Sequence, residues 1–287
     1  MAANTAYGRS TGSPLPLNPG RERGWIDGFG NLFRNENALW WRTRRWLVHV
    51  LLWTLLVNGL LAAALFAPQE AAASPPVQQG AFDPNDPLFL GSILLFVVGG
   101  LATGIGAIII MQGVILDEKK SGTAAWLLSK PVSRAAFVLA KWSANVLASI
   151  LLLIVLQGAL AYVVISARIG NALPVGPFAV GISLLGLNLL FYLSLTLMLS
   201  TLFDGRGAVL GIPLGVLFGA QLGYQIAPWL SQIMPWLLIV PPNGNDALSM
   251  LAMRGQPLTS VTPILATAVW IVIFVGVSVW RFKREEF

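Results

Sequence analysis

Residues 177–203 read PFAVGISLLGLNLLFYLSLTLMLSTLF, a run without a single charged side chain. A helix that crosses the hydrocarbon core of a bilayer needs about 20 mainly apolar residues, so this run is long enough to span a membrane. Comparable charge-free apolar runs occur elsewhere in the chain, at residues 46–67, 88–116, 142–166, 208–227 and 261–280. We therefore expect an all-α, polytopic membrane protein with six transmembrane helices.

The composition of the whole chain indicates that lipid is its main solvent. Hydrophobic residues make up 56% of the 287 residues and charged residues only 10%, against roughly 25% charged in a typical soluble domain. Cysteine is absent and His49 is the only histidine, which excludes disulfides, thiolate chemistry and a Cys- or His-rich metal centre. No Gly-Lys-Ser or Gly-Lys-Thr run is present, so the chain lacks a phosphate-binding loop of its own.

The N-terminal region divides into two stretches. Residues 1–24 are rich in Gly, Pro and Ser and are expected to form a disordered tail. Residues 25–41 interleave Trp and other apolar side chains with charged ones. That pattern is typical of a helix lying at the membrane interface, with a plain tether as the alternative. Residues 25–287 are then expected to form one membrane domain.

The placement of the basic residues predicts the orientation of the chain. All but two of the 18 Lys and Arg residues lie before the first run, between the second and third, after the fourth, or in the C-terminal tail. Only Arg168 and Arg254 fall on the other side. Because cytoplasmic loops carry the Lys and Arg excess, both termini are expected to be cytoplasmic, in the cell inner (plasma) membrane. The net charge of +6 is thus a topology signal, and nucleic-acid binding is not expected.

Titratable side chains are nearly absent from the predicted spans. Apart from His49, no residue in the six runs titrates near neutral pH. Ion-coupled carriers and pumps generally bind their driving ion through such groups, and membrane-embedded proteases need a nucleophile with its base or an Asp pair. The sequence therefore argues against both classes, and we expect no catalytic, cofactor-binding or metal-binding residue in this chain.

The predicted fifth span carries a regular row of glycines. They recur every four residues, at Gly207, Gly211, Gly215, Gly219 and Gly223. A ridge of small residues lets another helix approach closely, so we expect a helix–helix seam here, either within the subunit or between two subunits. Pro213 predicts a kink in the same helix. Gln221 and Gln225 follow near its outer end, where they either line an exit route or bond to neighbouring helices.

The segment after the fifth span is partly apolar, but it does not suit a full span. Residues 228–260 are interrupted by three prolines, Pro235, Pro241 and Pro242. Because proline removes a backbone donor and ends or kinks a helix, short interfacial or re-entrant helices are expected in this segment.

The most specific stretch lies between the second and third spans, at residues 112–141, which read QGVILDEKKSGTAAWLLSKPVSRAAFVLAK. Gly122 is expected to end the helix that leaves the membrane, and Thr123 can cap a short helix that continues to Ser129. Pro131 then stops this helix, and Ser133 can cap the next one. The result would be a short amphipathic helix held beside the membrane surface.

This loop resembles that of the ABC-2-type permease family, the membrane subunits of ATP-binding-cassette transporters of the type-2 exporter class. The shared pattern consists of Glu118, Gly122, Thr123, Leu127, Leu128, Pro131, Val132, Ser133, Arg134 and Lys141. The resemblance extends to the six-span layout, the interfacial helix and the broken segment after the fifth span. It covers the chain from about Trp25 to the C-terminus and says nothing about the substrate.

The resemblance implies that the loop, about residues 117–141, is a coupling helix that docks on a separate ATPase subunit. The residues implied for that contact are Glu118, Gly122, Thr123, Trp126, Leu127, Leu128, Pro131, Ser133 and Arg134, with Asp204 and Arg206 in a smaller second contact. ATP and Mg would bind to the ATPase, so this chain would need no cofactor. Two permease subunits, expected to be a homodimer, would work with two copies of the ATPase.

On this basis the chain is expected to be the non-catalytic permease subunit of an ATP-driven exporter. The alternative is a membrane scaffold or assembly subunit that docks a cytoplasmic partner without transporting anything. A hydrated path between the second and fifth spans would favour transport, whereas a tightly packed seam there would favour the scaffold. The substrate stays open, as does the choice between a second copy and a related subunit as partner permease.

Overall fold

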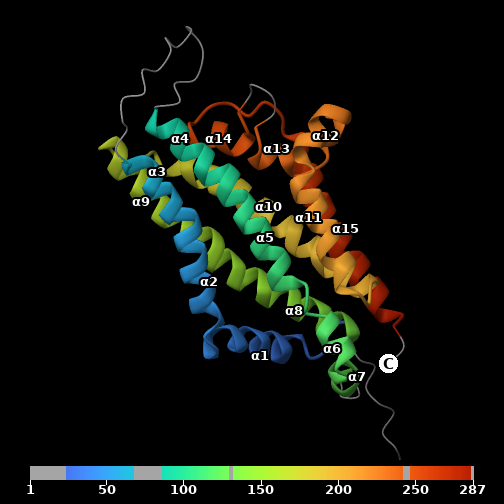
Figure 1. Cartoon of the computed structure of the whole chain (residues 1–287). Helices are drawn as coiled ribbons and strands as arrows, with labels where there is room; N and C mark the ends of the chain where they lie inside the picture. The colour runs from blue at the N-terminus through green and yellow to red at the C-terminus, as the bar shows by residue number, and fades with distance from the viewer. Residues whose placement is uncertain (1–23, 68–85, 129–131, 242–245, 286–287) are drawn as a thin grey trace, which may run out of the picture.

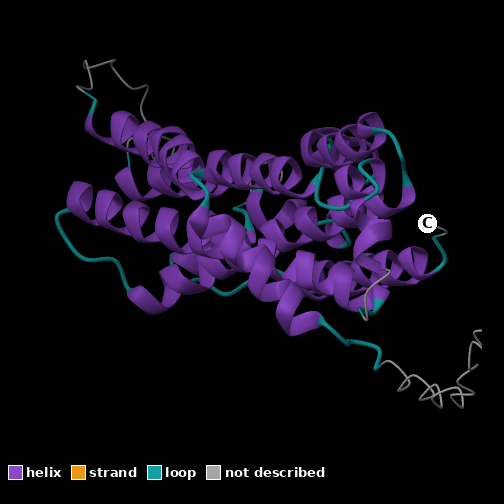
Figure 2. Cartoon of the chain, turned by 90° about the horizontal axis from the view of Figure 1, so that it is seen from below, coloured by secondary structure: helices purple, strands orange, loops and turns teal. Residues whose placement is uncertain are grey.

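The computed structural model of the chain describes residues 24–67, 86–128, 132–241 and 246–285. Within these ranges the regular structure is helical and contains no strand, which confirms the all-α prediction (Figure 2). The long helices run side by side in an elongated bundle (Figure 1). The predicted disordered tail, residues 1–24, lies outside the described residues except for Gly24.

Each of the first three spans is a long helix that contains one wider π-helical turn. The first span consists of α2 (Arg45–Trp53), η1 (Thr54–Gly59) and α3 (Leu60–Phe66). The second consists of α4 (Pro87–Ile93), η2 (Leu94–Val98) and α5 (Gly99–Met111). The third consists of α8 (Arg134–Ser149), η3 (Ile150–Val155) and α9 (Leu156–Ile169). Within the η1 turn, the Asn58 side-chain amide donates to the Gln157 side-chain oxygen at 2.7 Å, a hydrogen bond that lipid could not supply.

Five helices are long and apolar enough to cross a membrane: the three above, α10 (Val175–Leu202) and α15 (Thr262–Lys283). The predicted fifth span is instead a broken pair, α11 (Arg206–Phe218) and α12 (Ala220–Ile226). Pro213 lacks the N–H that would bond the carbonyl of Val209, and the helix is interrupted at Gly219. The prediction of six full-length helices is therefore corrected to five full-length helices and one broken pair. This pair, α11 and α12, follows α10 in the chain and runs back toward the opposite end of the bundle (Figure 1).

One end of the bundle carries most of the positive charge. There α1 (Phe29–Arg42) lies across the foot of the long helices, while α6 (Leu116–Lys120) and α7 (Thr123–Leu128) project beyond α5 (Figure 1). We call this the basic end, because it holds Arg34, Arg42, Arg44, Arg45, Lys119, Lys120, Arg134, Lys141, Arg206, Arg281, Lys283 and Arg284. The helix predicted over residues 25–41 is thus present as α1.

The opposite end is closed by the short helices that the prolines predicted. They are η4 (Pro228–Gln232), α13 (Trp236–Ile239) and α14 (Leu248–Met253). Leu238 and Leu248 are fully buried, so these helices belong to the packed core. Arg254 and Asp246 form a mostly buried ion pair at 2.7 Å at this end, which compensates a charge that would otherwise be costly.

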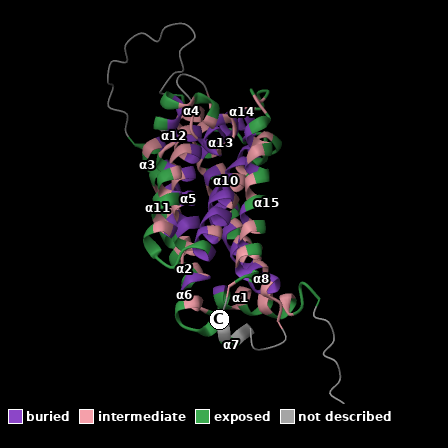
Figure 3. Ribbon diagram, turned by 90° about the vertical axis from the view of Figure 1, so that its right-hand side faces the viewer, coloured by how far each residue is buried: buried purple, intermediate pink, exposed green. Residues whose placement is uncertain are grey.

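The packed core of the bundle surrounds α10. Its buried side chains include Leu189, Leu193 and Leu197, and it is the most buried of the spans (Figure 3). The first span and α15 are the least buried of the long helices and present leucine and valine outward, as expected for helices that face lipid. The exposed sides of the bundle therefore suit a bilayer, and the chain is a multi-pass membrane protein.

Candidate functional site

The loop at the basic end turns sharply at Gly122. This glycine has a φ of +73°, a left-handed conformation in which a side chain would be strained, and it separates α6 from α7. Its carbonyl accepts a hydrogen bond from the Trp126 N–H at 3.2 Å, the first bond of α7. Thr123 is therefore the first helical residue and not the cap, which corrects the expectation. Ser133 caps α8 as expected, since its hydroxyl accepts from the Ala136 N–H at 3.0 Å.

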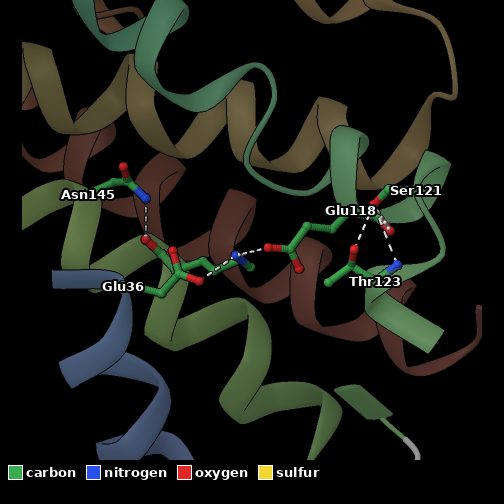
Figure 4. A network of polar contacts seen from close by, with 6 residues as sticks. Glu36, Glu118, Ser121, Thr123 and Asn145 are labelled. Carbon is green, nitrogen blue, oxygen red and sulfur yellow. Dashed lines mark hydrogen bonds and ion pairs between the residues drawn. The ribbon is translucent and has the colours of Figure 1, made fainter. Parts of the chain in front are cut away.

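A buried lysine joins three elements at this end (Figure 4). The Lys141 ammonium on α8 lies 2.6 Å from Oε1 of Glu36 on α1 and 2.5 Å from Oε1 of Glu118 on α6. Its side chain is 5% exposed, so water screens these contacts weakly. One ammonium is shared by two carboxylates, and the second oxygen of Glu118 is buried without a hydrogen-bond partner. We call these three residues the Lys141 triad.

Asn145, one turn beyond Lys141 on α8 (Figure 4), adds a second tie between α8 and α1. Its side-chain oxygen accepts from the Trp40 indole at 3.0 Å, and its amide donates to the Lys141 carbonyl at 2.8 Å. Sequence reasoning identified Lys141 and Glu118 through the loop pattern but missed Glu36 and Asn145. No local signal marks them, because Glu36 is separated from Lys141, and Trp40 from Asn145, by 105 residues.

A second set of ion pairs ties α6 to the turn between α10 and α11. Lys119 pairs with Asp204 at 2.9 Å, and Asp117 pairs with Arg206 at 2.8 Å. The hydrogen bond from Lys119 and the charge of its ammonium lower the pKa of the Asp204 carboxyl. Glu285, just after α15, also pairs with Lys119, at 2.9 Å. The two residues predicted for a smaller second contact, Asp204 and Arg206, are thus brought against the main loop.

The residues predicted for partner docking point in different directions. Trp126 is 60% exposed on α7 and offers an apolar surface beyond the bundle. Glu118 turns inward to Lys141, and the Arg134 guanidinium donates to the carbonyls of Lys283 and Glu285, at 2.7 and 2.6 Å. Pro131 and the side chains of Leu127 and Leu128 lie outside the described part of the structure.

The glycine row of the predicted fifth span divides into two parts. A Cβ atom added at Gly207, Gly211 or Gly215 would meet nothing within 4 Å, so these glycines pack against no other helix among the described residues. At Gly223 the same atom would run into the ring of Trp236. At Gly219, which follows the end of α11, it would meet the carbonyl of Gly215 in the last turn of α11 at 2.7 Å. The expected seam is therefore internal only at the α12 end.

The second and fifth spans are in close contact. A Cβ atom at Gly104 would lie 2.8 Å from Leu217, which leaves no room between α5 and α11 at that height. The Trp236 indole donates to the Val216 carbonyl at 2.7 Å, beside the break between α11 and α12. Gln225 is exposed, and the side chain of Gln221 lies outside the described residues. The predicted role of the two glutamines therefore stays a prediction.

No three His, Asp or Glu side chains among the described residues are placed to hold a metal ion. The polar groups at the basic end instead form paired charges that connect helices. Such an arrangement can hold a surface helix in place and transmit its movement.

Comparison with known proteins places the chain in a family. Residues 31–287 match a family described as "ABC-2 family transporter protein". The chain is also 28% identical over 182 residues to a protein of Bacillus subtilis (strain 168) named "Uncharacterized transmembrane protein YxlG". That similarity covers 61% of this chain and 66% of the relative, just under two thirds of its length. Because the family match runs from α1 to the C-terminus, the chain belongs to the ABC-2 family of transporter membrane proteins.

Proposed function

We propose that this chain is the permease subunit of an ATP-binding-cassette exporter and moves its substrate outward with ATP hydrolysed by a separate ATPase subunit. The observation that carries this proposal is the α6–α7 loop, which presents Trp126 outward and is anchored to the bundle through the Lys141 triad. The positive charge of the basic end supports a cytoplasmic position for it, and the proposal accordingly puts both termini on the cytoplasmic side of the plasma membrane.

The ion pairs suggest how a displacement of α7 by a bound ATPase would be transmitted to the membrane helices. Since α7 follows α6 after a single turn at Gly122, a force on α7 acts directly on α6. From α6 it passes to α1 and α8 through Glu118 and Lys141. It passes to the start of α11 through the Asp117–Arg206 pair. Closure of an ATPase against α7 would therefore move both sides of the bundle together.

The exposed part of the glycine row fits a second copy of the chain. Gly207, Gly211 and Gly215 leave one face of α11 open, and small residues allow another helix to approach closely. In the proposed assembly two copies of the permease meet along this face, and each binds one ATPase that carries ATP and Mg. Because α5 and α11 are closely packed within one chain, the substrate path would run between the two copies.

The same close packing favours a second candidate function. A chain whose second and fifth spans meet without a path suits a membrane scaffold, which docks a cytoplasmic partner and transports nothing. Both functions need the α6–α7 loop, so docking alone does not separate them. Movement of a substrate does.

The test is co-expression with the ATPase subunit encoded beside this chain. The wild type is compared with Trp126→Glu, and Trp229→Glu is the matched control, because Trp229 is 65% exposed at the opposite end. We expect the wild type and the control to copurify with the ATPase and support ATP hydrolysis, and Trp126→Glu to lose both. If the wild type binds no ATPase, or if Trp126→Glu binds as well as the control, the coupling assignment is wrong.

Transport is then measured in inside-out membrane vesicles that contain both subunits. ATP-dependent movement of a fluorescent amphiphile, absent with a hydrolysis-deficient ATPase, supports the exporter. Stable docking and hydrolysis without movement of any amphiphile in a broad panel would support the scaffold.

A further inference from the structure

A cavity of about 530 Å³ lies at the basic end between α1, α2, α5, α6 and α8. This volume is within the range of small-molecule sites in proteins, roughly 300–1,000 Å³. Its inner wall is polar and includes the Lys141 triad and Asn145. Its rim includes Leu39 and Ile109, both exposed apolar residues. The cavity is therefore polar inside and apolar at its edge, as the binding site of an amphiphile would be.

The negative charges on the α6 side of the cavity are not fully neutralised by the cations beside them. The single ammonium of Lys141 faces the carboxylates of Glu36 and Glu118, so the triad carries one excess negative charge. The second oxygen of Glu118 is buried without a hydrogen-bond partner, which is unfavourable for a carboxylate. Asp117 and Arg206, which also line the cavity, neutralise each other. The cavity thus lacks one cationic donor on the α6 side.

The α2 side of the cavity carries a positive charge that is not neutralised by a nearby carboxylate in the described part of the chain. Arg45 lines the cavity and forms no ion pair with a carboxylate of the described residues. His49, one turn further along α2, accepts from the Trp53 indole through Nδ1 at 3.1 Å. Its other ring nitrogen is then the donor in the neutral ring. This side therefore offers a positive charge and an N–H group to an anion.

We propose that the cavity binds the headgroup of a phospholipid that carries a phosphate and a primary ammonium, as phosphatidylethanolamine does. The ammonium donates to the Glu118 carboxylate, whose side chain is 26% exposed, and so offsets the excess negative charge of the Lys141 triad, while the phosphate pairs with Arg45. The acyl chains leave past Leu39 and Ile109 into the bilayer. A choline headgroup has no N–H to donate, and a glycerol headgroup has no cation, so neither satisfies Glu118 in this way.

This inference goes beyond the proposed function, because it concerns binding by the permease chain alone. The full-length chain is purified in detergent and mixed with equal amounts of phosphatidylethanolamine, phosphatidylcholine and phosphatidylglycerol of identical acyl chains. Native mass spectrometry then measures which lipid the protein retains. We expect phosphatidylethanolamine to be retained about tenfold better than phosphatidylcholine, which corresponds to about 1.4 kcal/mol.

Two variants test the proposed contacts to the ammonium and to the phosphate of the headgroup separately. Glu118→Gln is expected to abolish the preference for phosphatidylethanolamine over phosphatidylcholine, because the acceptor carboxylate is gone. Arg45→Gln is expected to lower the retention of both lipids alike, since both carry the phosphate. Arg45 is exposed and forms no ion pair with the described residues, so this variant should fold normally even if Glu118→Gln does not.

Arg44→Gln is the matched control, because Arg44 is also exposed but does not line the cavity. It is expected to retain lipids as the wild type does. Equal retention of the three lipids by the wild type would overturn the proposal. So would an unchanged preference in Glu118→Gln, or an equal loss in Arg44→Gln and Arg45→Gln, which would indicate surface charge alone. No ATPase is present in this assay, so its failure leaves the proposed permease function untouched.

Discussion

Replacing Lys141 with Met tests the role of the Lys141 triad as the anchor of the loop. The ammonium lies 2.6 Å from Glu36 and 2.5 Å from Glu118, and it is the shared partner of both carboxylates. Methionine is of similar length and apolar, so the packing of the side-chain stem is largely kept. The substitution therefore leaves two carboxylates facing each other without their cation.

The expected cost follows from the burial of the residues involved. Removing one partner of a buried ion pair typically costs about 3–5 kcal/mol, because a charge is left uncompensated. The side chains of Glu36 and Glu118 are 18% and 26% exposed, so water reaches them in part. We therefore expect a loss at the lower end of that range, about 3 kcal/mol. At about 2 °C per kcal/mol for a large chain, the melting temperature should fall by roughly 6 °C.

Thermal unfolding in one detergent, followed by tryptophan fluorescence at a fixed scan rate, measures this change. Lys120→Met is the matched control, because Lys120 is an exposed lysine of α6 outside the triad and should shift melting by about 1 °C or less. A triple variant that also carries Glu36→Gln and Glu118→Gln removes the uncompensated charge. It should recover most of the lost stability.

Two results would refute this reasoning. If Lys141→Met melts within about 1 °C of the wild type, the triad does not hold the loop to the bundle. If the triple variant is no more stable than the single one, the cost arises from packing and not from uncompensated charge.

The two parts of the glycine row and the second ion-pair set give further predictions. Gly223→Leu should destabilise the chain by about 1–3 kcal/mol in a melting assay, because the new side chain would meet the Trp236 ring. Gly211→Leu should leave melting of the monomer unchanged but weaken the dimer seen by cross-linking; an intact dimer would exclude this face as the seam. The low pKa of Asp204 means that its pair with Lys119 contributes fully above the unfolded value of 3.8 and is lost only as the pH falls through the lower folded pKa. Because Asp204 is 85% exposed, Asp204→Asn should cost only about 0.2–1 kcal/mol at pH 7, and a pH series of wild type and variant should show the difference vanish below the folded pKa.

The sequence by itself determined the features that depend on local pattern. Apolar runs of sufficient length predict helices, because in lipid the backbone must satisfy its hydrogen bonds internally, and five of the six runs form one long helix each. The turn at Gly122 and the cap at Ser133 were also predictable, since each depends on a few neighbouring residues. The grouping of basic residues at one end follows from the order of the runs alone.

Only the tertiary structure decided which side chains meet. Glu36 and Lys141 are far apart in the chain, and their contact depends on how α1 and α8 are rotated and tilted against each other. A row of glycines shows that one helix face is small, but not whether that face is packed. Within the described residues, Gly223 is the one glycine of the row that meets another helix. The break at Gly219 likewise divided a run that satisfied the apolar-length criterion. Helix rotation, tilt and breaks are set by packing between distant segments, which composition and periodicity do not encode.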